Sequence, residues 1–374
     1  MNNSQHAAFI VFSGFNQRAV IAFCRMLTTW RIPFFIVALS EQDQIFQTSY
    51  REQVVAIRSK ESLVQEDLVD QINKVKEKSE YKLHYILPSS EALNRHLLIH
   101  RKQFEDINCI IPLVDEDLYT RISDKYSFGS LCEKYGVDVP SEKTANPNMH
   151  FPVIIKPKKY LGSEGKTYSP RFINNFGELE KFFQEVNSRD DFYIQSFVPG
   201  DSYYLMYYIS RGGYIRSFSQ QNLVQQGGGK SIVAAIPSSL HNMEISHLFE
   251  KLLKQEGFFG LIMIEVRWFQ NKYYMIEANP RLWGPSQLLV DCKAGLFEAM
   301  LLDLGFDLQL EQDENNMSAR YFWLGGFLDA LAHQSIDFHG TTPEQFLFSM
   351  NEFINNEVYL RKDTLSIAIP QKEI

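Results

Sequence analysis

The stretch that decides the fold is Met263-Ile-Glu-Val-Arg-Trp-Phe-Gln-Asn-Lys-Tyr-Tyr-Met-Ile-Glu-Ala-Asn-Pro-Arg281. Its two halves, residues 261–269 and 273–278, run apolar or alternate like strands, and Gln270-Asn271 between them has turn chemistry. The stretch therefore predicts a β-hairpin, which would bring Glu265 beside Glu277. Glu277 and Asn279 are two residues apart on one strand, so their side chains point to the same face.

Three oxygen-bearing side chains can converge on this hairpin, from Glu265, Glu277 and Asn279. Oxygen donors without Cys or His suit Mg²⁺, which takes few protein ligands and completes its octahedron with water and phosphate oxygens. Acidic residues on a hairpin are usually a solvated face, but the strand around Glu277 is apolar, and a buried carboxylate needs a cation or partner. Pro280 ends the strand, and Arg281 then offers a planar fork for phosphate or carboxylate. These features predict a site for a metal nucleotide.

Glu277-Ala-Asn279-Pro-Arg281 resembles the end of the last metal-binding strand of the ATP-grasp superfamily. The longer run to Gly284 is similar to a bacterial subgroup of carbamoyl-phosphate-synthetase-like carboxylate-amine ligases. The resemblance implies a two-lobed ATP-grasp fold that binds ATP with Mg²⁺, or with Mn²⁺ in its place. It implies that Glu265, Glu277 and Asn279 are metal ligands, and that Arg281 and Lys156 act in catalysis.

Further segments follow the order of that superfamily. In such enzymes an Asp-Lys pair precedes a small lid, a second Lys lies on an apolar strand, a Gly-rich loop comes next, and a hinge binds adenine ahead of an acidic residue that often meets the ribose. The resemblance gives nucleotide-binding roles to Lys125, Lys156, Gly162, Ser163, Glu164, Gly165, Gln195, Ser196, Phe197, Val198 and Asp201.

The physical support for these matches is unequal. Lys156 sits among Val153-Ile154-Ile155, and a lysine on a buried strand is costly unless it meets an anion, so phosphate contact is favoured over a snorkelling stem. Lys125 taken alone is explained equally well as surface charge. Gly162 and Gly165 would let backbone N–H groups approach phosphates, but two glycines in a polar loop are a weak signal.

The hinge and two candidate substrate residues leave alternatives open. Ser196 stands where the superfamily commonly has Glu, so selectivity for adenine stays open even though backbone groups can recognise the base. Lys230 follows Gly227-Gly228-Gly229, which predicts a mobile substrate or phosphate loop, with a flexible surface hairpin as an equal alternative. Trp283, like Arg281, would lie near the substrate in the family's geometry, although an aromatic residue beside a helix is more often core.

The chain begins with a βαβ order: a strand over residues 8–12, a helix to about residue 30 and a strand over 34–39. This order predicts a doubly wound parallel sheet, as in the domain that precedes the ATP-grasp fold in similar ligases. The expected fold class is α/β and α+β. The expected domains are an N-terminal pre-ATP-grasp α/β domain (1–115), a lid (116–190), a large lobe with the metal site (191–315) and a C-terminal extension packed on that lobe (316–374).

Composition agrees with a multidomain enzyme. A chain of 374 residues exceeds one ordinary core, and its hydrophobic fraction of 45% argues against disorder. The net charge of −8, without a long basic run, disfavours nucleic acid or a membrane surface as the main partner. The four cysteines are widely spaced, with no C-x-x-C pair, and no apolar run reaches the length of a signal peptide or membrane span. We expect a cytoplasmic protein.

The implied activity is that of an ATP-dependent carboxylate-amine ligase. Its γ-phosphoryl transfer would make an acyl phosphate, and an amine would then form an amide or peptide bond with release of ADP and phosphate. The partners would be a small-molecule carboxylate and amine, drawn from amino acids, peptides or sugar acids, and a homodimer would not be unusual. Two alternatives remain: an ATP-binding regulatory protein without ligation, and a small-molecule kinase.

Overall fold

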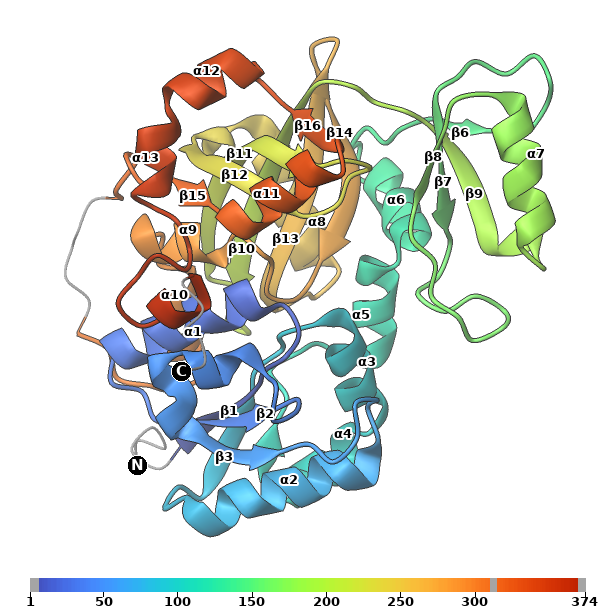
Figure 1. The fold of residues 1–374 in the computed structure, drawn as a ribbon. Coiled ribbons are helices and arrows are strands. Elements are labelled where there is room, and N and C mark those ends of the chain that lie inside the picture. Colours follow the sequence, from blue (N-terminus) through green and yellow to red (C-terminus); the bar gives the residue numbers. More distant parts are fainter. Residues whose placement is uncertain (1–6, 310–314, 369–374) are drawn as a thin grey trace.

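The N-terminal part of the chain is a five-stranded parallel sheet flanked by helices (Figure 1). The structure is a computed structural model that describes residues 7–309 and 315–368. The strand order is β3-β2-β1-β4-β5. Strands β2 and β3 are added on one side of β1 and strands β4 and β5 on the other, so the strand order reverses between β1 and β4. The expected doubly wound sheet is confirmed, and the reversal is where such sheets bind ligands. The strands are β1 (Ala7–Phe12), β2 (Phe34–Ala38), β3 (Val54–Ile57), β4 (Leu83–Ile86) and β5 (Cys109–Ile110).

Both faces of this sheet are covered. Phe9 and Val11 of β1 pack in the cluster that contains the apolar face of α1, whereas Ile10 and Phe12 pack in the cluster that contains α2. This two-sided burial explains why β1 is apolar throughout. The surrounding elements are the helices α1 (Gln17–Thr29), α2 (Gln65–Lys78), α3 (Glu91–Ile99) and α4 (Arg101–Asp106), and the 3-10 turns η2 (Gln44–Gln47) and η3 (Ser49–Gln53).

The large lobe is built on a mostly antiparallel sheet in the order β14-β13-β10-β11-β12-β15, with β16 paired to β11. One face packs with the N-terminal domain through Tyr204 and Met206, and the other packs on α8 through Leu205 and Tyr207. Its strands are β10 (Asp201–Ile209), β11 (Ile215–Gln226), β12 (Ile232–Ser238), β13 (Gly260–Phe269), β14 (Lys272–Asn279), β15 (Tyr321–Phe322) and β16 (Ile336–Phe338). Its other elements are η5 (Leu240–Asn242), α8 (Glu244–Gln255), α9 (Ser286–Asp291) and α10 (Leu296–Asp303).

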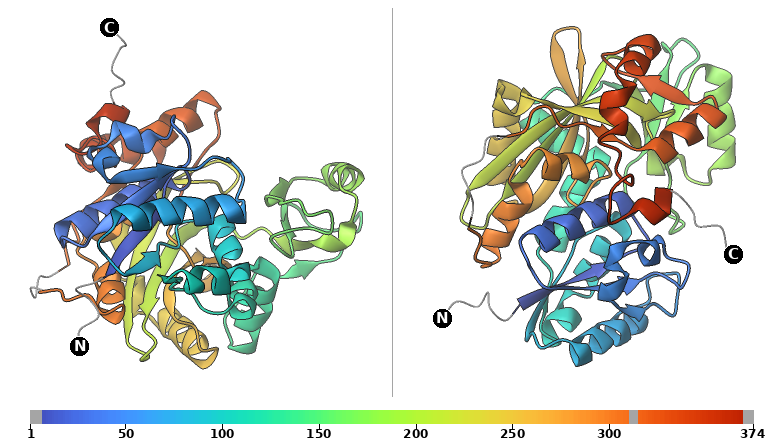
Figure 2. Two further views of the ribbon diagram at one scale, coloured as in Figure 1. Left: turned by 90° about the horizontal axis from the view of Figure 1, so that it is seen from below. Right: turned by 60° about the vertical axis from the view of Figure 1, so that its left-hand side comes forward.

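A smaller lid projects from the side of the molecule (Figure 2). It holds a four-stranded sheet in the order β6-β9-β7-β8, with its own small core. The elements are β6 (Glu142–Lys143), β7 (Val153–Pro157), β8 (Arg171–Ile173), α7 (Phe176–Glu185), η4 (Arg189–Asp191) and β9 (Phe192–Ser196). The expected lid boundary at residue 190 falls before β9, which lies in the lid sheet. At the other end, α5 (Glu116–Ser123) and α6 (Lys125–Lys134) pack on β14 of the large lobe.

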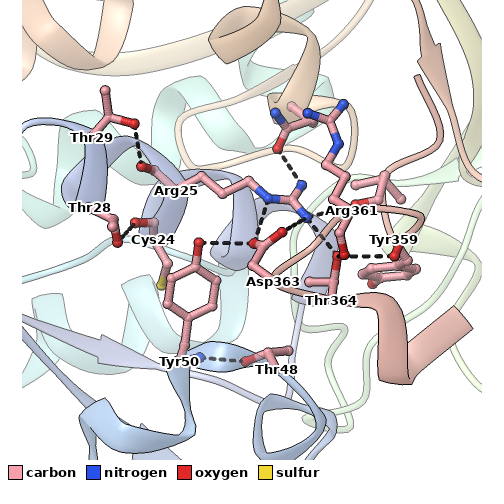
Figure 3. Close-up of polar contacts among 12 residues, drawn as sticks. Cys24, Arg25, Thr28, Thr29, Thr48, Tyr50, Tyr359, Arg361, Asp363 and Thr364 are labelled. Atoms are coloured by element: carbon pink, nitrogen blue, oxygen red, sulfur yellow. Dashed lines mark hydrogen bonds and ion pairs between the residues drawn. The ribbon is translucent and has the colours of Figure 1, made fainter. Parts of the chain in front are cut away.

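The C-terminal segment joins both large domains. Its strands β15 and β16 extend the large sheet, and its helices are α11 (Leu324–Ala332), α12 (Pro343–Phe348), α13 (Met350–Ile354) and α14 (Leu365–Ala368). Asp363 then lies against the N-terminal domain, where it accepts hydrogen bonds from Arg25 Nε (2.8 Å) and Tyr50 Oη (3.0 Å) (Figure 3). Within the described residues, no helix has the length and apolar character needed to span a membrane.

Substitution Asp363→Ala should lower the free energy of unfolding by about 3 kcal/mol, because it leaves the Arg25 guanidinium, only 10% exposed, without its carboxylate. Urea denaturation of the full chain measures the change. The matched control is Asp106→Ala, which removes an ion pair with Lys102 at the surface and should change little. Equal stability of Asp363→Ala and the wild type would contradict a stabilising role for this pair.

The same pair should weaken in acid. Burial raises the pKa of Asp363, but the hydrogen bond and charge of Arg25 outweigh burial and hold the pKa below its ordinary value of 3.8. The stabilisation is therefore complete above that value and is lost as the pH falls through the lower folded-state pKa. Denaturation repeated at falling pH should show the wild type losing its advantage over Asp363→Ala.

Candidate nucleotide and metal site

The expected hairpin is confirmed as β13 and β14. Gln270 (φ 49°) and Asn271 (φ 61°) both adopt the left-handed conformation that a tight two-residue hairpin turn requires. The register places Glu265 opposite Glu277, and the pairing shifts by one residue just after Glu265. This bulge leaves Ile276 without a partner on β13 and increases the local twist beside the two carboxylates.

The three predicted metal ligands lie together. Asn279 Nδ2 donates to Glu277 Oε1 at 2.8 Å, and Ser202 Oγ from β10 donates to Glu265 Oε1 at 3.2 Å. No group of three or more His, Cys, Asp or Glu side chains placed to hold a metal occurs in the described part of the chain. An ion here would have two carboxylates and one amide oxygen, and would complete its shell with oxygens from outside the protein. This donor set fits Mg²⁺.

Cationic side chains from separate elements surround these oxygens. Lys125 Nζ, at the start of α6, lies 2.6 Å from Glu277 Oε2, and Arg281 Nη2 donates to Asn279 Oδ1 at 3.0 Å. Lys156 Nζ, on β7 of the lid, donates to the carbonyl of Ile276 at 3.2 Å. The structure therefore brings Lys125, Lys156 and Arg281 to the end of β14.

Burial and neighbouring charge set the ionisation of the site. Burial lowers the pKa of Lys156 to about 8, with a further lowering from Lys125 that Glu277 opposes. Burial acts to raise the pKa of Glu277, but Lys125 and the hydrogen bond from Asn279 outweigh it and hold the pKa at about 2. For Glu265, burial dominates and raises the pKa. Lys156 is thus a buried ammonium whose charge phosphate oxygens would compensate.

The Gly-rich loop of the lid is closed on itself. Gly162 N–H donates to the Lys166 carbonyl at 2.9 Å, and Gly165 has a φ of 71° that favours glycine. A Cβ on Gly162 would lie 2.9 Å from Asp191 Oδ2, the atom that accepts hydrogen bonds from the backbone and the hydroxyl of Ser163 (both 2.8 Å). Glu164 contacts Lys166 and Asn187. The loop is therefore held on its own lid through Asp191, which sequence reasoning did not identify.

The predicted hinge, residues 195–198, connects the lid sheet to β10 of the large lobe (Figure 1). Gln195 is buried, its Nε2 donates to the Pro140 carbonyl at 3.1 Å, and its Oε1 has no partner among the described residues. Ser196 Oγ pairs with Ser141 Oγ at 3.1 Å. The Phe197 ring packs edge-on against another phenylalanine, and Val198 is buried. The adenine role of the hinge stays a prediction.

For three other predicted site residues, no contact with the carboxylates is found among the described residues. Strand alternation puts Asp201 on the face of β10 opposite to Ser202 and therefore opposite to Glu265. Lys230 is an exposed residue of the β11–β12 turn, and within the described residues its ammonium forms no hydrogen bond or ion pair. Trp283 is only 1% exposed and packs in the core, so its side chain is positioned for packing rather than open contact.

A polar network that the sequence did not disclose joins the N-terminal domain to this site. Glu91, the first residue of α3, accepts hydrogen bonds from Arg95 (2.8 Å) and Tyr119 (2.9 Å) and lies 3.8 Å from Arg281 Nε. Arg95 also donates to Asp124 Oδ1 at 2.6 Å. Ser90 caps α3, because its Oγ accepts a hydrogen bond from the Leu93 backbone, and the tertiary structure then brings Glu91 close to Arg281.

Comparisons with known proteins agree with this architecture. Residues 122–285 match a sequence family described as the ATP-grasp domain. No curated protein shows significant sequence similarity to the chain. Among solved structures, similarity extends to pyruvate carboxylase of Rhizobium etli, with a TM-score of 0.59 and 16% identity over 83% of this chain and 30% of that one. The chain therefore spans less than a third of that relative.

Two further structures match over a larger share of their length. A biotin carboxylase–ATP complex from Campylobacter jejuni has a TM-score of 0.59 and 15% identity, covering 83% of this chain and 74% of that one. An N5-carboxyaminoimidazole ribonucleotide synthetase from Thermus thermophilus has a TM-score of 0.58 and 12% identity, covering 80% and 79%. At these identities the likeness shows the fold, and it confirms the expected two-lobed architecture behind an N-terminal parallel sheet.

Substitution Glu277→Gln should reduce Mg²⁺-dependent ATP turnover about 100-fold, because it removes a charged ligand while keeping the side chain's size. Circular dichroism melting should show an intact fold. Glu133→Gln, an exposed carboxylate on α6, is the control and should retain full turnover. Undiminished turnover by a folded Glu277→Gln variant would show that Glu277 is not a metal ligand.

Proposed function

We propose that the chain is an ATP-dependent carboxylate-amine ligase, because residues 122–285 match a family described as the ATP-grasp domain. The observation that carries the proposal is the cluster in which Lys125, Lys156 and Arg281 surround the oxygens of Glu277 and Asn279. Oxygen ligands beside several cations suit a bound metal and a polyphosphate at once.

The residues have separate roles in this proposal. Glu265, Glu277 and Asn279 would hold Mg²⁺, which supplies charge neutralisation at phosphate oxygens when bound. Lys125 and Lys156 would contact the phosphates of ATP directly, and the buried setting of Lys156 strengthens that contact because little water screens it. Arg281, fixed by Asn279 and its own neighbour Leu282, would orient the transferred group or the acid substrate.

The proposed reaction has two steps. A carboxylate oxygen of the acid attacks the γ-phosphorus of ATP, a new P–O bond forms, the β,γ-bridging bond breaks, and ADP leaves. The amine nitrogen then attacks the acyl carbon, the bond from that carbon to the phosphate oxygen breaks, and the nitrogen loses a proton to give an amide. The protein supplies no nucleophile in this scheme. Its contribution is to position the charges and to exclude water from the acyl phosphate.

The deciding assay measures ADP release from ATP and Mg²⁺ with pooled amino acids and amines, with and without pooled carboxylic acids that include sugar acids. A ligase should release ADP only when both pools are present, and mass spectrometry should find an amide. ADP release with phosphate retained on one acceptor would instead identify a kinase. The amine and carboxylic-acid pools are extended until each chemical class of substrate is represented. ATP binding without turnover in all of these pools would favour a regulatory protein.

Substitution Lys156→Met should weaken ATP binding about tenfold, because a buried charge-assisted contact to phosphate is lost. Isothermal titration calorimetry with Mg²⁺ and ATP measures the affinity. Lys159→Met, three residues further along and exposed, is the matched control and should bind like the wild type. Equal affinities for both variants would show that Lys156 does not contact the nucleotide.

A further inference from the structure

A pocket of about 330 Å³ lies in the N-terminal domain, outside the carboxylate and lysine cluster. It is lined by residues that follow three parallel strands: Ser13 after β1, Arg58 after β3, and Ser89 and Ser90 after β4. It therefore lies at the carboxyl ends of the strands, at the point where the sheet order reverses between β1 and β4. Parallel sheets bind ligands at this position, and the volume is that of a small-molecule site.

Arg58 is the cation of this pocket, and its charge is poorly compensated. Its side chain is 2% exposed, and Nη2 donates to the carbonyls of Glu61 (3.0 Å) and Ser62 (2.7 Å). Nε is buried without a hydrogen-bond partner among the described residues, and the nearest carboxylate, Asp67 Oδ2, is 4.0 Å away. Carbonyl dipoles alone are weak partners for a buried charge.

The Asp67 carboxylate also accepts hydrogen bonds from groups other than Arg58. Its Oδ1 accepts hydrogen bonds from the backbone and hydroxyl of Ser59 (3.0 and 2.7 Å) and from Gln71 (2.9 Å), and its Oδ2 accepts from the Lys60 backbone. These bonds already satisfy the carboxylate. An anion entering the pocket would give the Arg58 guanidinium the partner that Asp67 supplies only at long range.

Of the other lining residues, Phe12, Phe15, Leu63, Ala92 and Leu93 are apolar, and Ser13, Glu61, Ser62, Ser89 and Ser90 are polar. Phe12, Phe15, Leu63 and Leu93 form the walls, and Phe15 is 51% exposed at the molecular surface. The hydroxyl of Ser13 already donates a hydrogen bond to Asp43 Oδ2 at 2.6 Å. A hydrated inorganic anion would leave these apolar walls unused, whereas a molecule with an apolar body and one anionic end would use both features.

We propose that this pocket binds a small carboxylic acid with an apolar body, whose carboxylate pairs with Arg58 and whose body packs on Phe12, Phe15 and Leu63. The site is separate from the nucleotide site and does not depend on the ligase reaction. The two are linked through the β4–α3 connection, because Ser90 lines the pocket and the next residue, Glu91, lies 3.8 Å from Arg281.

Calorimetric titration of the full chain without ATP tests the proposal. The probes are phenylacetate and 4-methylpentanoate, the matched amine phenethylamine, and inorganic phosphate, each at up to millimolar concentration. Binding of at least one of the two acids, and of neither phenethylamine nor phosphate with comparable affinity, is expected. The proposal is overturned if neither acid binds, or if the amine or phosphate binds as tightly as the acids. Because ATP is absent, failure here leaves the proposed ligase function untouched.

Two variants then locate the binding. Arg58→Gln should weaken acid binding at least about tenfold, because it removes a charge-assisted contact. Ala92→Trp, at an exposed position of the lining, should block the pocket without removing any of the Arg58 contacts, so it carries the test if Arg58→Gln fails to fold. Arg51→Gln, an exposed arginine of the same domain, is the control and should bind like the wild type. Unchanged acid binding in a folded Ala92→Trp variant would place the acid elsewhere.

Discussion

The pairing of Glu265 with Glu277 across β13 and β14 is the constraint on which the rest of the site depends. Two neighbouring carboxylates in a partly buried setting repel each other and lose hydration, so they persist only among compensating charges. The structure provides these from three elements: Lys125 at the start of α6, Lys156 on β7 and Arg281 after β14. The contacts of Lys125 and Lys156 thereby connect α6 and the lid strand β7 to β14.

The N-terminal domain takes part in the same charge balance. Glu91 lies 3.8 Å from Arg281, and Arg95 one turn later binds both Glu91 and Asp124. Asp124 Oδ1 also accepts a hydrogen bond from the backbone of Tyr160 at 3.2 Å, at the base of the Gly-rich loop. Helix α3 is thus connected to Arg281 at the end of β14 on one side and, through Asp124, to the Gly-rich loop of the lid on the other.

Local sequence patterns predicted much of this arrangement. The alternation around Gln270-Asn271 predicted the hairpin register, and the apolar neighbours of Lys156 predicted a buried ammonium that needs an anion. Contacts between distant segments were not predictable in this way. Ser163 meets Asp191 only because the loop folds back on the lid, and Asp201 faces away from Glu265 because of its position in the alternation of β10. Likewise, nothing in the sequence around Arg58 shows that its nearest carboxylate is already satisfied.

The lid contacts β14 through Lys156, whereas its Gly-rich loop is held on the lid itself. Lys156 reaches the carbonyl of Ile276 from β7, so the base of the lid already touches β14. The Gly162–Gly165 loop is instead held by the two hydrogen bonds from Ser163 to Asp191. Movement of this loop over a bound nucleotide would have to break them, at about 1 kcal/mol each. That cost is small, and phosphate oxygens of a bound nucleotide could accept hydrogen bonds from the same N–H and O–H groups.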